Sequence, residues 1–166
     1  MVQHMADDRI TRRCDCGAPA GPLGVCADYY YRILAEEQAD PQMYRWHAPV
    51  VCVYLLQHPA GAHQKSLDGQ FRLLQLYLDK GLDALLRVAA HQVARNNHRA
   101  RSGYDMRPLA PYAPLPLGGP PQRFRATFCG LPFESDSFVS DGHAAYGNRI
   151  ETIAEATAEA WRAVQA

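Results

Sequence analysis

The chain has 166 residues, of which 48% are hydrophobic and 20% are charged, a composition typical of one globular domain with its own core. Its 17 basic side chains equal its 17 acidic ones, so the chain lacks the excess positive charge that nucleic-acid binding requires. No apolar run is long enough to span a membrane and no signal-peptide pattern is visible, so we expect a cytoplasmic protein without a membrane partner. In that compartment the five cysteines are expected to be thiols or metal ligands rather than disulfides.

Arginine outnumbers lysine fifteen to two, and alanine is abundant. This usage is typical of a bacterial gene with a high GC content. The local basic stretch Arg95, His98, Arg99 and Arg101 follows a predicted helix, where the helix dipole favours basic side chains. We therefore interpret it as a solvated helix end and expect no nucleic-acid partner.

The chain begins with two segments in which no regular structure is expected. Residues 1–13 are polar and are interpreted as a disordered or appended tail, which leaves residues 14–166 as a single folded domain. Residues 14–26 are rich in glycine and proline and have cysteines near both ends. This composition disfavours helix and strand and predicts a loop.

Apolar side chains then recur at the 3.6-residue spacing of amphipathic helices. Asp40-Pro41 ends the first such segment and His58-Pro59 ends the second, because the residue before a proline avoids helical geometry. The spacing predicts helices over residues 27–38, 48–57, 66–80, 82–96 and 144–164. The expected buried side of the second helix is formed by Val50, Val51, Tyr54 and Leu55.

Seven of the twelve prolines fall within residues 99–141, between the last two predicted helices. Proline fixes φ and lacks an N–H donor, so we expect a long loop packed across the helices, with a short extended piece over 123–128. The predicted fold class is therefore all-α, a small helical bundle with a long proline-rich loop.

Three thiols lie in the glycine-rich loop, at Cys14, Cys16 and Cys26. Zinc in structural sites takes four thiolate or imidazole ligands at the corners of a tetrahedron. The Cys-x-Cys pair is tighter than the usual two-residue gap but can still chelate, and Gly17 lets the backbone fold back after it. We therefore expect a zinc ion that staples this loop to the bundle.

The fourth ligand is expected to be one of the histidines that bracket the second helix, His47 or His58. At about 1.5 Å per residue the two lie roughly 15 Å apart, so they cannot bind the same ion. If the first two helices form an antiparallel hairpin, Cys26 at the start of the first lies beside His58 at the end of the second. We therefore prefer His58 and keep His47 as the alternative.

The same hairpin would bring His47 close to Glu37 at its other end. A histidine beside a carboxylate suits acid–base chemistry, and Tyr54, two turns along the same helix, can donate a hydrogen bond to a substrate. His47, Glu37 and Tyr54 are thus the candidate catalytic residues, against the simpler interpretation of an interhelical hydrogen bond and a half-buried tyrosine. Cys52 is interpreted as a small buried hydrophobe and Cys129 as a bystander.

Several of these stretches also occur together as a pattern. They are Cys16-Gly17-Ala18, Cys26, His47, Val51, Tyr54, Gln57, His58 and Pro59. The pattern resembles an uncharacterised bacterial family, common in actinobacteria, with an N-terminal Cys-Gly-Ala cluster and a His…Val…Tyr-x-x-Gln-His-Pro helix. The resemblance covers most of the chain and implies a small helical fold with a metal site, but no activity. The chain departs from it in the close spacing of Cys14 and Cys16, and in Cys52, where an aspartate is common.

The sequence thus predicts a metal-binding protein, with zinc as the expected ion. The first hypothesis is a small metal-assisted enzyme of bacterial specialised metabolism, acting on a small-molecule substrate. The alternatives are a binding module with structural zinc and no catalysis, and a metal or redox sensor that uses the cysteine loop as its switch. Four protein ligands would make the site structural and an open position would make it catalytic, a choice that the sequence leaves open, as it does a homodimer.

Overall fold

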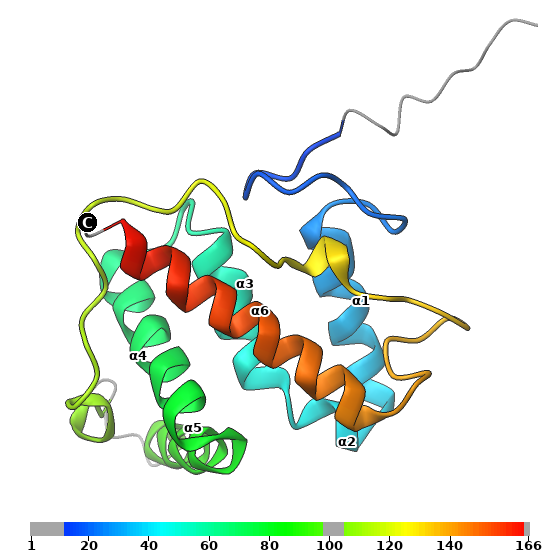
Figure 1. Ribbon diagram of the computed structural model, residues 1–166. Coiled ribbons are helices and arrows are strands. Elements are labelled where there is room, and N and C mark those ends of the chain that lie inside the picture. Colours follow the sequence, from blue (N-terminus) through cyan, green and yellow to red (C-terminus); the bar gives the residue numbers. More distant parts are fainter. Residues whose placement is uncertain (1–11, 98–104, 165–166) are drawn as a thin grey trace, which may run out of the picture.

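The computed structural model describes residues 12–97 and 105–164. Within these residues the chain forms six α-helices and no strand, which confirms the all-α prediction (Figure 1). Most of the predicted tail, residues 1–11, and three members of the basic stretch, His98, Arg99 and Arg101, lie outside the described residues. None of the described helices combines the length and the apolar character needed to cross a membrane.

The first helices follow one another closely along the chain. They are α1 (Cys26–Ala39), α2 (Pro41–Tyr44) and α3 (His47–Gln57). The short α2 was not predicted, because Asp40-Pro41 was interpreted only as a stop. Asp40 instead caps a new helical turn, since its Oδ1 accepts hydrogen bonds from the backbone N–H of Gln42 and Met43 at 3.0 and 3.2 Å, and Pro41 takes the first helical position.

The remaining helices are α4 (Gln64–Lys80), α5 (Leu82–Asn97) and α6 (His143–Ala163). Gly81 separates α4 from α5 with a φ of 87°, a conformation that side chains disfavour. The glycine therefore ends α4, so that two separate helices form. Figure 1 shows α6 lying across α3, with α4 beside them and α1 on the far side of α3 from α4.

The core lies where α3 packs against both α4 and α6. Because two helices cover α3, its buried side chains are not the single stripe that we predicted. Val50 is buried as expected, but Val51, Tyr54 and Leu55 are only half-buried. The buried residues of α3 are Pro49, Val50, Cys52, Val53, Leu56 and Gln57. Some buried polar atoms pair across the core, as when the Trp161 indole N–H donates to the Leu56 carbonyl at 2.9 Å.

The proline-rich segment wraps the bundle from α4 to α1 (Figure 1). Its described part is irregular apart from two short 3-10 turns, η1 (Arg107–Leu109) and η2 (Phe128–Gly130), and the extended piece predicted over 123–128 forms no strand. Side chains of α4 hold it down, since Gln75 donates to the Ala113 carbonyl at 2.8 Å and Asp68 accepts from the Leu115 N–H at 2.8 Å. The wrap thereby brings η2 against the start of α1.

Candidate metal centre

The N-terminal cysteine loop contains a tight turn that brings the thiols of Cys14 and Cys16 to the same cluster. The Cys14 N–H donates to the Ala18 carbonyl at 2.8 Å, and the Gly17 N–H donates to the Cys14 carbonyl at 2.9 Å. Gly17 has a φ of 89°, and a Cβ there would lie 2.6 Å from the Gln122 carbonyl oxygen. A glycine is therefore required both by the turn and by the close approach of the wrapping segment.

The chain before the turn is also ordered where the structure describes it. Arg12 and Arg13, which we assigned to the tail, pair with Pro19 and Ala20 in an antiparallel arrangement. The Ala20 N–H donates to the Arg12 carbonyl at 3.0 Å. The cysteine turn is thus closed at its base by backbone contacts on both sides.

Cys26 is fixed by the start of α1. Asp28 accepts a hydrogen bond from the Val25 N–H at 2.8 Å, so its carboxylate caps the helix that Cys26 begins. The Cys26 side chain is fully buried at 0% exposure. The start of α1 therefore fixes the position of the buried Cys26 thiol.

Four side chains that sequence reasoning grouped as ligands lie together. The sulfurs of Cys14, Cys16 and Cys26 and a ring nitrogen of His58 all lie within 4.8 Å of one another. The Cys16 and Cys26 sulfurs are 3.7 Å apart, and the Cys14 sulfur is 3.3 Å from His58 Nε2. This cluster of three thiols and an imidazole could hold a metal ion.

The cluster lies at one end of the α1–α3 pair. Cys26 is the first residue of α1 and His58 directly follows α3, so the start of one helix lies beside the end of the other. At the opposite end His47 Nδ1 and Glu37 Oε2 are hydrogen-bonded at 2.7 Å. The two histidines therefore belong to different ends of the pair.

The His58 ring is oriented by its own helix. Nδ1 lies 2.9 Å from the Tyr54 carbonyl oxygen, an acceptor, so this nitrogen carries the proton. Nε2 then faces the cysteines, and its lone pair is available to a metal ion once this nitrogen is unprotonated. A ligand histidine in proteins is commonly fixed by such a bond from its other nitrogen.

Hydrogen bonding within the cluster favours charged forms. The hydrogen bond from Cys26 lowers the pKa of Cys16 to about 4 in spite of burial, and the same bond raises the pKa of Cys26. Burial lowers the pKa of His58, but its hydrogen bonds with Cys16, the Tyr54 carbonyl and Cys14 outweigh burial and raise that pKa to about 9. Without a metal these shifts favour a thiolate at Cys16 and a protonated ring at His58, and a bound ion would take the place of the Nε2 proton.

Cys129, which the sequence analysis interpreted as a bystander, brings a fourth sulfur close to the cluster. Its sulfur lies 3.4 Å from that of Cys26 and 3.7 Å from the Gly24 carbonyl oxygen. It does not belong to the set of four, and it is half-buried rather than buried. More than a hundred residues separate it from Cys26, so no local motif could have pointed to it. Cys52 is elsewhere, buried in the core, and burial raises the pKa of its thiol to about 12.

The three candidate catalytic residues do not form one group. Glu37 and His47 form the hydrogen-bonded pair described above, with the Glu37 side chain fully buried. Tyr54 lies with the metal cluster, where its ring stacks between Tyr30 at 3.8 Å and His58 at 4.6 Å. None of the three lines either of the two clefts that adjoin the cluster.

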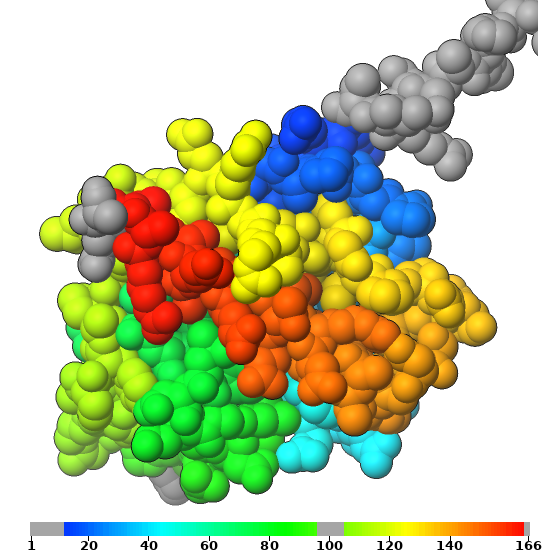
Figure 2. Space-filling view, in the orientation of Figure 1, coloured from blue at the N-terminus to red at the C-terminus, as the bar shows by residue number. Residues whose placement is uncertain are grey.

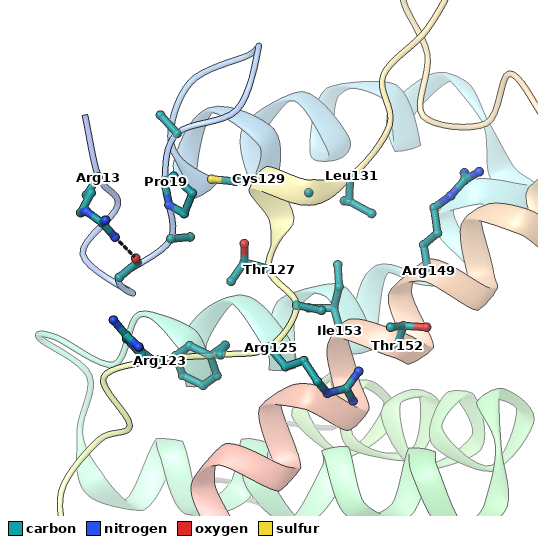
Figure 3. Close-up of a pocket in the computed structure, with 16 residues that line it drawn as sticks. Arg13, Pro19, Arg123, Arg125, Thr127, Cys129, Leu131, Arg149, Thr152 and Ile153 are labelled. Atoms are coloured by element: carbon teal, nitrogen blue, oxygen red, sulfur yellow. Dashed lines mark hydrogen bonds between the residues drawn. The ribbon is translucent and has the colours of Figure 1, made fainter. Parts of the chain in front are cut away.

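Those two clefts open on either side of the cysteine turn. One, of about 630 Å³, is lined by Gly17, Ala18 and Cys129 together with arginines of the wrapping segment and α6 (Figure 3). The other, of about 910 Å³, is lined by Asp15 and His58 and by the prolines of the wrap. Figure 2 shows the blue N-terminal loop and the yellow part of the wrap meeting on one surface.

Comparison with known proteins places the chain in a family. Residues 11–162 match the model of DUF5946, a family of unknown function. The chain belongs to DUF5946. The matched range contains Cys14, Cys16, Cys26 and His58 as well as Cys129. The match confirms that the chain belongs to an uncharacterised family, as the sequence analysis expected. No curated protein and no solved structure matches the chain.

Proposed function

We propose that Cys14, Cys16, Cys26 and His58 bind one zinc ion in a closed, structural centre, and that the protein acts as a zinc-stapled binding module. The observation that carries the proposal is the convergence of three thiols and one imidazole, from two loops and a helix start, within 4.8 Å of one another. This donor set is a common one for structural zinc, and softer thiolates exclude magnesium and calcium.

The spacing of the donors supports a tetrahedral ion. With zinc–sulfur bonds of about 2.3 Å, tetrahedral geometry separates two sulfurs by about 3.8 Å, and a sulfur from a nitrogen by slightly less. The observed separations are 3.7 Å between Cys16 and Cys26 and 3.3 Å between Cys14 and His58 Nε2. These two pairs match tetrahedral geometry, and the remaining pairs, all within 4.8 Å, would need to close by up to about 1 Å around the ion.

Four protein ligands leave no position for water or substrate, which is why we propose a structural role. The ion would join the cysteine turn to the start of α1 and to the end of α3. What it supplies when bound is a fixed link between an irregular loop and the helical bundle. Catalysis by Glu37, His47 and Tyr54 has less support, because Tyr54 lies at the opposite end of the helix pair from the other two.

Metal analysis of the purified protein tests the proposal. We expect about one equivalent of zinc per chain, with X-ray absorption showing three sulfurs at about 2.3 Å and one nitrogen at about 2.0 Å. Cys16→Ser should lose the metal. The matched control is Cys129→Ser, which removes a neighbouring thiol outside the set of four and should keep it. Bound zinc below about half an equivalent, or equal loss in both variants, would contradict the proposal.

A second candidate function, redox sensing, is favoured by the 3.4 Å separation of the Cys26 and Cys129 sulfurs. A hydrogen peroxide molecule can take two electrons from the zinc-bound Cys26 thiolate and the Cys129 thiol: an Sγ–Sγ bond forms, the O–O bond breaks, and the two oxygens leave as two waters, which take the Cys129 proton and one proton from solvent. Cys26 would then no longer be a zinc ligand, so oxidation would release the ion.

Peroxide treatment of the zinc-loaded protein separates the two candidate functions. A sensor should form a Cys26–Cys129 disulfide, detected by peptide mass spectrometry, and release zinc in step with it. Cys129→Ser should then slow the release by about tenfold. Release at the same rate in this variant, or disulfides between other pairs, would leave only the structural role.

A further inference from the structure

The smaller cleft beside the metal cluster has a strongly one-sided charge. Its sixteen lining residues include four arginines and no aspartate or glutamate. The arginines come from three parts of the chain: Arg13 from the loop before the cysteines, Arg123 and Arg125 from the wrap, and Arg149 from α6 (Figure 3). The formal net charge of the whole chain is zero, so this concentration of arginines is local.

Two of these arginines already have carboxylate partners outside the cleft. Arg149 is paired with Asp141 through both of its terminal nitrogens. Arg125 lies 3.4 Å from Glu159, but both side chains are more than half exposed, so water and salt weaken that pair. The Arg149 guanidinium is therefore already neutralised by Asp141, whereas Arg125 can exchange Glu159 for another anion.

The other two arginines make no ion pair with a described residue. Arg13 donates to the Gly17 carbonyl at 3.1 Å, and Arg123 has no ion-pair partner among the described residues. Both lie against the same residue, because the Cγ of Arg123 would be 4.0 Å from a Cβ placed on Gly17. Two arginines beside one glycine, without an ion-paired carboxylate, place unneutralised positive charge on this wall of the cleft.

The rest of the lining suits an organic ligand. Thr127 and Thr152 offer hydroxyls, and in Figure 3 Thr127 lies between Arg123 and Cys129 at the middle of the cleft. Apolar surface comes from Phe124, Leu131 and Ile153. A volume of about 630 Å³ is that of a typical small-molecule site.

We propose that this cleft binds a small organic anion whose phosphate or carboxylate group is held by Arg13 and Arg123, while Arg125, which points away from these two in Figure 3, adds to the positive charge of the cleft. Guanidinium groups bind both kinds of anion through paired N–H donors. The apolar body of the ligand packs on Phe124 and Ile153. The inference deepens the proposed function, on which it rests, because it names the ligand class of the zinc-stapled module.

The metal centre and the cleft share a wall. Gly17 follows Cys16 directly, and Gly17 and Ala18 line the cleft. Zinc bound to Cys14 and Cys16 would hold this turn, and with it Arg13, against the wrapping segment. Anion binding should therefore weaken when the ion is removed, although none of the four proposed zinc ligands lines the cleft.

Calorimetric titration with phenyl phosphate, benzoate, inorganic phosphate and phenol tests the proposal on the full-length, zinc-loaded protein. We expect phenyl phosphate or benzoate to bind, and phenol, which lacks the charge, not to bind up to about 10 mM. The arms with phenyl phosphate and benzoate distinguish a phosphate ligand from a carboxylate. Inorganic phosphate should bind more weakly than phenyl phosphate, because it leaves the apolar wall unused.

Variants locate the binding. Arg123→Ala should weaken the better probe by about tenfold, and Arg123→Lys should recover only part of that loss, because lysine lacks the paired donors. Arg87→Ala, an exposed arginine on α5, is the matched control and should bind normally. No binding of either charged probe, equal binding of phenol, or equal loss in the Arg87 variant would overturn the anion site.

Zinc content measured on each sample keeps the two proposals apart. If Arg123→Ala retains zinc and loses the probe, both stand. If the protein holds zinc yet binds no charged probe, the cleft fails and the metal centre stands. If purified protein holds no zinc, the proposed function fails, and binding of the probe sensitive to Arg123→Ala would still support the anion site.

Discussion

The two ends of the α1–α3 pair each carry a histidine, but with different partners. At one end His58 meets three thiols, and at the other His47 meets the single carboxylate of Glu37. The helices alone supply only one partner at each end, Cys26 or Glu37. What makes one end a candidate metal centre is the additional loop, which adds Cys14 and Cys16 to the pair.

The difference shows how a helix hairpin can carry two unrelated polar sites. A lone buried carboxylate beside a half-exposed imidazole gives a stabilising hydrogen bond, because the histidine satisfies one oxygen of Glu37. Three thiols and an imidazole give a coordination set, because each adds a donor to a common point. Histidine position alone therefore does not identify a metal site; the converging partners do.

The largest expected effect comes from removing the ion itself. A strong chelator should lower the melting temperature of the zinc-loaded protein by about 10 °C, which corresponds to roughly 3–4 kcal/mol for a chain of this length. The helices should persist, because their core is apolar, so far-UV circular dichroism should change little. Scanning calorimetry with and without chelator measures the shift, and an unchanged melting temperature would contradict a staple.

The next effect compares the two histidines directly. His58→Ala should lower zinc affinity by about a hundredfold or more, since loss even of a group that merely orients a ligand costs 10- to 100-fold. His47→Ala should leave zinc affinity unchanged, because His47 lies at the other end of α3. Competition titration with a chromophoric chelator measures both. The reverse ranking would show that the alternative fourth ligand, His47, was the right one.

Much of the fold could be predicted because the spacing of apolar residues within each segment indicates a helix. The five predicted helices begin and end within two residues of those observed. The four-residue α2 was missed because it is too short for a periodic pattern, although Asp40 and Pro41 are a capping residue and a first-turn proline. The buried side of α3 was wrong because two packing partners cover it, which no pattern within one helix reveals.

The residues of the candidate site that are close in sequence could be predicted, and those brought in by distant segments could not. Cys14, Cys16 and Cys26 are close in sequence, and the hairpin argument extended this set to His58. Cys129 could not be found, because it reaches Cys26 through the irregular wrap, whose path follows from hydrogen bonds such as that between Gln75 and the Ala113 carbonyl. The arginine cleft was missed for the same reason, since its walls come from segments more than a hundred residues apart.

A smaller effect concerns the end of the pair without thiols. The Glu37 side chain is fully buried, and its other oxygen, Oε1, has no hydrogen-bond partner among the described residues. His47→Ala should therefore destabilise the fold by about 1–3 kcal/mol, the cost of a buried polar group left unpaired. Urea unfolding measures the change.

Two further variants check the cause of that change. His47→Gln keeps a donor toward Glu37 and should retain most of the stability. Adding Glu37→Gln to His47→Ala removes the buried charge and should recover part of the loss. A double variant no more stable than His47→Ala alone would indicate that the packing of His47 on Tyr44, with rings 4.9 Å apart, matters more than the hydrogen bond.

The smallest expected effect belongs to Tyr54, which lies one helical turn before His58 at the thiol end of the pair. Its ring stacks on Tyr30 and His58, while its hydroxyl makes no hydrogen bond to a described residue. Tyr54→Phe should therefore keep zinc affinity within about twofold and stability within about 0.5 kcal/mol, because the ring carries the contact. Tyr54→Ala should weaken zinc binding more, since His58 would lose the ring that restrains it. A large loss on removing the hydroxyl alone would reverse the argument and give this tyrosine the donor role that its place on α3 first indicated.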